Sequence, residues 1–75
     1  MSEPFIAPSA RKHGVSNEAI RHAFDNPAYT VSPRDDLTLL VGTDHAGNFL
    51  EVGVVDTDEG PLVVHAMPLR TKHKR

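Results

Sequence analysis

The pattern of apolar residues changes at Pro27. Four short apolar runs follow this residue, and residues typical of tight turns separate them. Two of the separating segments, 44–48 and 56–61, hold the Asp, Asn, Gly and Pro residues that reversals require. Loops this short favour antiparallel neighbours, since a parallel return needs a long crossover. We therefore expect an antiparallel meander of strands at residues 28–32, 37–43, 49–56 and 62–67.

Helical signals precede this meander. Ser16 is a good N-cap, and the apolar spacing behind it predicts a helix over residues 17–24. Pro27 ends that helix, because proline cannot continue the hydrogen-bond ladder. A shorter helical turn is expected over residues 9–13, ending at Gly14, which suits the left-handed position after a helix.

Helices first and a meander afterwards predict an α+β fold, with one or two N-terminal helices packed on a sheet of three or four antiparallel strands. We expect Leu50, Val52 and Val54 to face the helix, because they alternate with their neighbours along one strand. Residues 1–75 are predicted to form a single domain, in which residues 1–8 are loosely ordered and residues 71–75 form a flexible basic tail.

A length of 75 residues limits the core that the chain can bury, so its stability should be thin and a partner protein could add to it. The absence of cysteine excludes disulfides, a thiolate nucleophile and zinc sites built on cysteine. The longest apolar runs have the length of strands, and nothing in the sequence indicates a membrane span or a signal peptide. We expect a cytoplasmic location.

The net charge of −2 hides a strong asymmetry along the chain. Residues 1–24 sum to +1, residues 25–64 to −7 and residues 65–75 to +4. This distribution favours an arrangement in which the two ends converge on a phosphate backbone while the acidic middle stays solvated. The alternative is a basic tail without a specific partner.

Five sequence blocks, in this order, resemble BrnT-type toxins of bacterial toxin–antitoxin pairs and their small actinobacterial relatives: Lys12 to Ser16, Phe24 to Pro27, Leu39 to Asp44, Gly47 to Val52 and His65 to Arg70. The resemblance covers residues 10–72, nearly the whole chain. It implies a compact fold of the RelE superfamily and metal-independent cleavage of mRNA. It also implies a cognate antitoxin that forms a hetero-oligomer with the toxin, neutralises it, and represses their shared promoter with it.

Metal-free RNA cleavage needs a base for the ribose 2′-hydroxyl, an acid for the departing 5′-oxygen, and cations for the crowded phosphate. His13 is our first candidate for the acid or the base, because histidine titrates near neutral pH, and His65 is the second. Lys12 and Arg70 are candidates to hold the phosphate. Further RNA contacts are expected from the remaining basic residues near the two ends, Arg11, Lys72, Lys74 and Arg75. No cofactor and no metal ion is expected.

Each candidate also has a structural interpretation. His13 sits where a cation favours the end of a helix, and His65 is the lone histidine of an apolar strand. Arg70 follows Pro68, at a solvated chain end. A metal site from Asp44, His45 and Asp56 has no recognised ligand spacing. The second functional hypothesis is therefore a noncatalytic module of the same fold, which binds protein or nucleic acid.

Overall fold

The computed structural model describes residues 4–69, and these form two helices and five strands. The elements are, in chain order, β1 (Phe5–Ile6), the 3-10 helix η1 (Pro8–Arg11), α1 (Asn17–Asp25), β2 (Pro27–Arg34), β3 (Leu37–Thr43), β4 (Phe49–Thr57) and β5 (Gly60–Pro68). The predicted α+β class is confirmed, although most of the described chain is sheet. Within this part of the chain, no helix has the length and hydropathy needed to cross a membrane.

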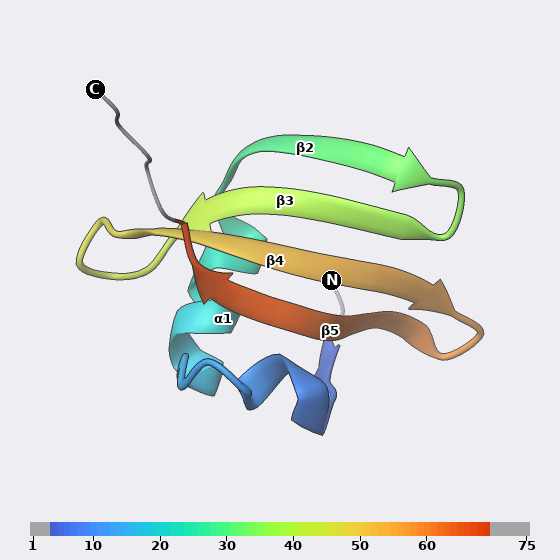
Figure 1. Cartoon of the computed structure of the whole chain (residues 1–75), viewed down its shortest axis with the longest axis horizontal. Helices are drawn as coiled ribbons and strands as arrows, with labels where there is room; N and C mark the ends of the chain where they lie inside the picture. Colours follow the sequence, from blue (N-terminus) through green and yellow to red (C-terminus); the bar gives the residue numbers. More distant parts are fainter. Residues whose placement is uncertain (1–3, 70–75) are drawn as a thin grey trace.

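The five strands form a single sheet in the order β1-β5-β4-β3-β2 (Figure 1). Strands β2 to β5 follow one another as an antiparallel meander. The four predicted strands match them to within two residues at every end. The turn chemistry of the sequence therefore predicted this part of the fold correctly.

The N-terminal segment corrects two expectations. Phe5 and Ile6 pair in parallel with β5, and Pro8 opens η1, so residues 4–8 are not loosely ordered. The sheet is consequently mixed and five-stranded, rather than antiparallel with three or four strands. A two-residue strand is too short to show an alternating pattern, and its pairing depends on the edge of β5 that it covers.

Helix α1 forms as its caps predict. The Ser16 hydroxyl accepts a hydrogen bond from the Ala19 amide at 3.1 Å. At the other end the helix stops at Asp25, and Pro27 begins β2 two residues later. The predicted turn over residues 9–13 is present as η1, and Gly14 after it has a φ of 76°, which glycine adopts without strain.

The hydrophobic core lies between the helices and one face of the sheet (Figure 1). Leu50, Val52 and Val54 are buried on this face, as predicted from their alternation. Gly42 allows α1 to approach β3 closely, because a Cβ at this position would overlap the Ala23 carbonyl. The buried residues of the cluster are Ala10, Ile20, Ala23, Leu40, Leu50, Val52, Val54, Val63 and Ala66.

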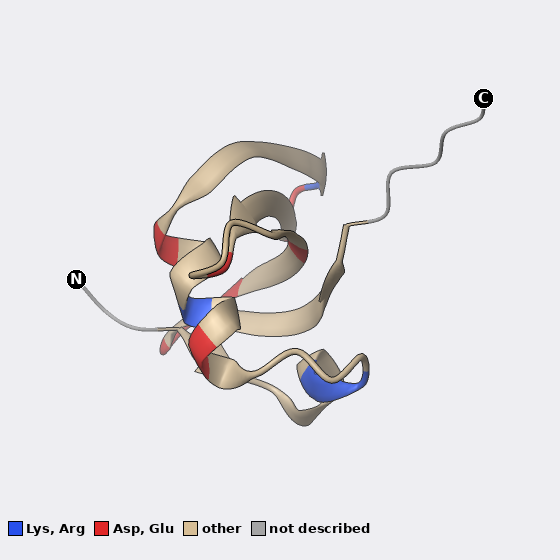
Figure 2. Cartoon of the chain, turned by 90° about the vertical axis from the view of Figure 1, so that its left-hand side faces the viewer, with Lys and Arg blue, Asp and Glu red and all other residues tan. Residues whose placement is uncertain are grey.

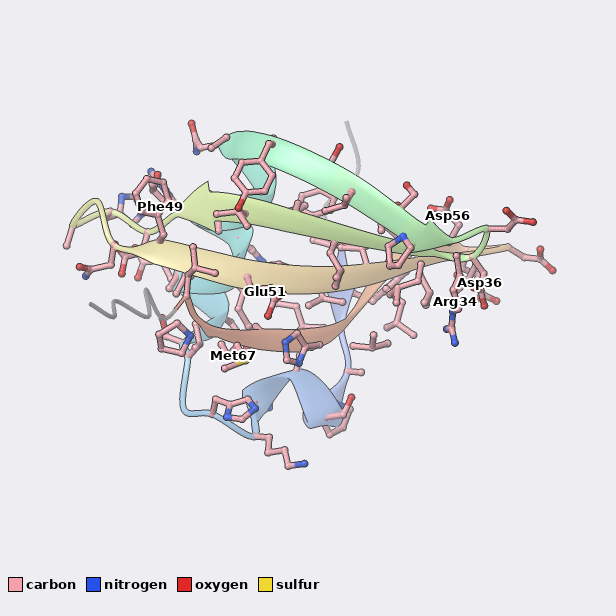
Figure 3. All side chains as sticks on the ribbon, turned by 45° about the horizontal axis from the view of Figure 1, so that its top comes forward. Arg34, Asp36, Phe49, Glu51, Asp56 and Met67 are labelled. Carbon is pink, nitrogen blue, oxygen red and sulfur yellow. The ribbon has the colours of Figure 1, made fainter. Side chains whose placement is uncertain are left out.

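Within residues 4–69, the opposite face of the sheet carries no helix, and we call it the open face. Two rows of paired residues cross it from β2 to β5: Tyr29–Val41–Glu51–Met67 and Val31–Leu39–Gly53–His65. Figure 3 shows Glu51 and Met67 projecting from the neighbouring strands β4 and β5. Tyr29, Val31 and Phe49 are each at least half exposed, so this face offers apolar surface to solvent.

Candidate functional site

The two histidines singled out from the sequence lie next to each other. The ring centroids of His13 and His65 are 5.9 Å apart, and the rings meet edge to face at 81°. His13 belongs to the segment after η1, whereas His65 lies in β5, more than fifty residues later. The fold thus brings together two candidate acid–base groups that the sequence alone does not place in contact.

Two hydrogen bonds to β5 and the burial of one of its own residues hold η1 and place His13. The Ala7 amide donates to the Val63 carbonyl at 2.9 Å, and the Ser9 hydroxyl donates to the Val64 carbonyl at 2.9 Å. Ala10, which belongs to η1, is completely buried in the core. The chain then leaves η1 through Gly14, whose amide donates to the Arg11 carbonyl at 3.1 Å. His13 is therefore carried on an anchored turn rather than on a free loop.

Gly53 makes room for His65 on the sheet. The two residues are directly paired between β4 and β5. A Cβ on Gly53 would lie 3.1 Å from the His65 Cβ, tighter than ordinary contact. The missing side chain lets the imidazole lie over β4, where it reaches the neighbouring Glu51.

Glu51 gives His65 a carboxylate partner. Its Oε1 lies 3.4 Å from Nε2 of His65, and both side chains are about one-third exposed. A carboxylate beside one ring nitrogen favours the tautomer with the proton on that nitrogen, which leaves Nδ1 as the acceptor. The sequence analysis missed Glu51, although its alternation places it on the same face as His65 once the pairing of β4 and β5 is known.

The basic residues predicted to contact RNA are only partly within the described chain. Lys12 is exposed and directly precedes His13. Arg11 is exposed as well, and its Nε donates to the Asn17 Oδ1 at 3.2 Å, so it also supports the start of α1. The basic end of η1 stands apart from the acidic residues of α1 and the hairpins (Figure 2). The other predicted cations, Arg70, Lys72, Lys74 and Arg75, lie outside the described residues, as does the expected tail.

A pocket of about 540 Å³ opens beyond this pair, between the start of α1, the β3–β4 turn and the end of β5. Its lining includes Gly14, which directly follows His13, and Pro68, three residues after His65. We call it the Phe49 pocket. Its walls include Val15, Ser16, Asp44, Asn48, Phe49 and Leu69.

Asp44 is the ionised group of this pocket. Its carboxylate accepts hydrogen bonds from the Ala46 and Asn48 amides at 3.0 and 2.8 Å, both at Oδ1. These bonds are stronger with the carboxylate than with the neutral acid as acceptor, and the Asn48 amide is the main reason that the pKa of Asp44 lies below its usual value. The sequence predicted a turn here but no site, because the pocket also needs residues from α1 and β5.

A second pair of histidines connects α1 with the β3–β4 turn, because His22 lies in α1 and His45 in the turn. The rings of His22 and His45 are 4.1 Å apart, and the His22 Nδ1 contacts the Thr43 carbonyl. His45 also approaches the Glu18 carboxylate at 3.5 Å, where both side chains are mostly exposed. Asp56 lies at the other end of β4 from this cluster. Among residues 4–69, no three His, Asp or Glu side chains are grouped as a metal site would require.

Comparison of the chain with protein families, curated proteins and solved structures found no match. The functional argument therefore depends on the residues of the site and on their geometry.

Proposed function

We propose that this protein is a metal-independent endoribonuclease, the toxin component of a type II toxin–antitoxin pair, with His13 and His65 as its acid–base pair. The observation that supports this proposal is the 5.9 Å separation of the two imidazoles, with Glu51 beside His65. At this separation both rings can reach atoms of a single phosphodiester group. The ordered resemblance to BrnT-type toxins supports the same class of function.

In the proposed reaction, Nδ1 of His65 removes the proton of the ribose 2′-hydroxyl, and Glu51 orients the ring. The 2′-oxygen then attacks phosphorus, and the bond from phosphorus to the 5′-oxygen breaks. Protonated His13 gives its proton to that departing oxygen. The products are a 2′,3′-cyclic phosphate and a free 5′-hydroxyl, which balances atoms and charge without water or metal.

Cations are needed beside this pair, because negative charge accumulates on the phosphate in the transition state. Lys12 is next to His13 in the chain and exposed, so it is suited to approach the phosphate as a point charge. We propose Arg70, which lies outside the described residues, as the second phosphate ligand. The cognate antitoxin would inhibit cleavage by covering this region.

A noncatalytic binding module is the second candidate function, and the open face favours it. Tyr29, Val31 and Phe49 expose 57%, 53% and 50% of their surface there. Exposed apolar residues that gather on one face are typical of protein-binding surfaces. In this alternative the His13–His65 contact is structural, and the chain acts only by holding a partner.

The decisive experiment measures cleavage of single-stranded RNA by purified protein in the presence of a metal chelator. We expect a 2′,3′-cyclic phosphate product, and a rate loss of about 10²–10⁴-fold in each of the variants His13→Ala and His65→Ala. His45→Ala is the matched control, because it removes an exposed histidine outside the pair. Thermal unfolding of all variants verifies folding. Cleavage rates equal to that of the wild type in all three variants, or no cleavage by the wild type, would favour the binding module.

A further inference from the structure

Strand β2 lies at one edge of the sheet, and within residues 4–69 no strand pairs with its outer side (Figure 1). All eight residues of β2 are exposed, and none of them belongs to the core cluster. Both faces of this strand are therefore accessible, together with its outer backbone groups. Unpaired N–H and C=O groups along an edge strand can bind a strand of another chain.

The composition of β2 permits pairing with a second copy of the same strand. Edge strands that must stay unpaired often carry charged side chains, which prevent such contacts. Residues 27–33 contain no charged residue. Tyr29 and Val31 lie on the open face, and each exposes more than half of its surface. Two copies of β2 can therefore align without bringing like charges together in the middle of the strand.

Two prolines limit where this pairing can occur. Pro27 and Pro33 have no N–H to donate, and the register of β2 against β3 shifts close to each of them. Regular pairing with β3 covers the three residues between these shifts, Tyr29, Thr30 and Val31. Thr30 is equally distant from both prolines. An antiparallel ladder of two β2 strands that is centred on Thr30 therefore keeps both prolines at its ends.

Two copies of β2 are complementary in this register. Thr30 lies opposite Thr30 of the second copy, and Tyr29 lies opposite Val31 of the second copy. Threonine pairs and pairs of an aromatic with a β-branched residue both stabilise antiparallel sheets. The two-fold axis of such a ladder is perpendicular to the sheet, so the open faces of both copies lie on the same side. Tyr29 and Val31 then form one continuous apolar strip across the two copies.

We propose that the protein forms a two-fold symmetric dimer, in which β2 of each copy pairs antiparallel with β2 of the other, centred on Thr30. The two five-stranded sheets become one continuous sheet. Strands β3 and β4 separate this interface from β5, so His65 stays accessible in both copies. A short ladder buries less surface than a permanent dimer, so we expect a reversible dimer with a dissociation constant on the order of 10 μM.

The first test is sedimentation equilibrium of the full chain over a concentration range that brackets this dissociation constant. Thr30→Lys and Thr30→Asp each place like charges opposite one another at the centre of the ladder. Each variant alone should raise the dissociation constant at least about tenfold. An equimolar mixture of the two variants pairs opposite charges and should restore the dimer. The matched control is Phe49→Lys, which changes an exposed residue of the open face on β4, and it should dimerise like the wild type.

A cysteine cross-link tests the register. The sequence contains no cysteine, so Thr30→Cys introduces a single thiol. Opposite Cα atoms in an antiparallel sheet are about 4.5–5.5 Å apart, which is within reach of a disulfide. In Ser32→Cys, the two thiols would be offset by four residues, or about 13 Å along the strand. We expect mild oxidation to give a covalent dimer of Thr30→Cys and much less of Ser32→Cys.

Several results would overturn the inference, and none of them depends on RNA cleavage. A monomer at all concentrations would refute the dimer. Dissociation by Phe49→Lys, with Thr30→Lys unaffected, would move the contact from the β2 edge to the open face. Equal cross-linking of Thr30→Cys and Ser32→Cys would refute the register. Thermal unfolding of each variant verifies that it is folded, which is expected because Thr30 is exposed.

Discussion

At the scale of single residues, Asp44 shows how one side chain serves both the fold and the candidate pocket. Its carboxylate closes the β3–β4 turn by accepting the Ala46 and Asn48 amides, and it also lines the Phe49 pocket. The hydrogen bonds of the turn favour the ionised form. Because the hydrogen bonds from Asn48 and Ala46 hold the pKa of Asp44 below its usual value, the folded protein keeps this charge in mildly acidic solution.

This lowered pKa predicts a contribution to acid sensitivity. A carboxyl group whose pKa is lower in the folded state stabilises the fold above its ordinary pKa, and this stabilisation is lost as the pH falls through the folded value. We expect the unfolding free energy of the wild type to fall more steeply between about pH 5 and pH 2 than that of Asp44→Asn. Urea unfolding at a series of pH values measures this. Parallel pH profiles of the two proteins would contradict the assignment.

The chemistry of single residues predicted the candidate acid–base side chains, but it did not predict all of the residues that contact them. His13 and His65 were candidates because imidazole titrates near neutral pH, and nothing in their spacing indicated that they touch. Glu51 was missed, since a glutamate on the solvent side of a strand is ordinary until its cross-strand neighbour is a histidine. Long-range pairing supplies this information, and a single sequence does not contain it.

At the scale of elements, the close contact between α1 and β3 is the most sensitive junction in the fold. Gly42 lies under the helix, where a Cβ would overlap the carbonyl of Ala23. The helix packs through Ile20 and Ala23, both completely buried. Any separation of α1 from the sheet would therefore open gaps around side chains that fill the centre of the core.

Gly42→Ala should accordingly destabilise the protein by about 1–3 kcal/mol, as overpacking of a close-packed interior does. The matched control is Ser32→Ala on the exposed strand β2, for which we expect a change within about 0.5 kcal/mol. Chemical unfolding monitored by circular dichroism compares the two variants. A stability of Gly42→Ala equal to that of the wild type would mean that α1 is less tightly packed on β3 than the structure indicates.

Elements with strong local signals were predicted well, and β1 was not. The meander follows from turn residues, and α1 follows from Ser16 and Pro27, so each of these elements is encoded within a few neighbouring positions. Strand β1 has two residues and forms only because β5 presents an edge to it. The parallel direction of β1 depends on where the chain enters the sheet. No local sequence pattern predicts that position.

At the scale of the whole molecule, charge is divided unevenly along the chain. Residues 25–64 carry a net −7, whereas residues 65–75 carry +4. The described basic residues of η1 lie away from the acidic hairpins (Figure 2). If the protein is the ribonuclease proposed above, its attraction to RNA must come from the ends of the chain, because the acidic middle repels a phosphate backbone.

This division predicts how RNA binding responds to salt. Replacement of Lys72, Lys74 and Arg75 by serine removes three cations and leaves Arg70 in place. If these cations contact RNA phosphates, the slope of log affinity against log salt should become shallower by about 2, since single strands contribute about 0.7 per neutralised phosphate. Fluorescence anisotropy with a labelled oligonucleotide measures both slopes. An unchanged slope would show that RNA binds without this segment, and would leave Lys12 and Arg70 as the cations of the site.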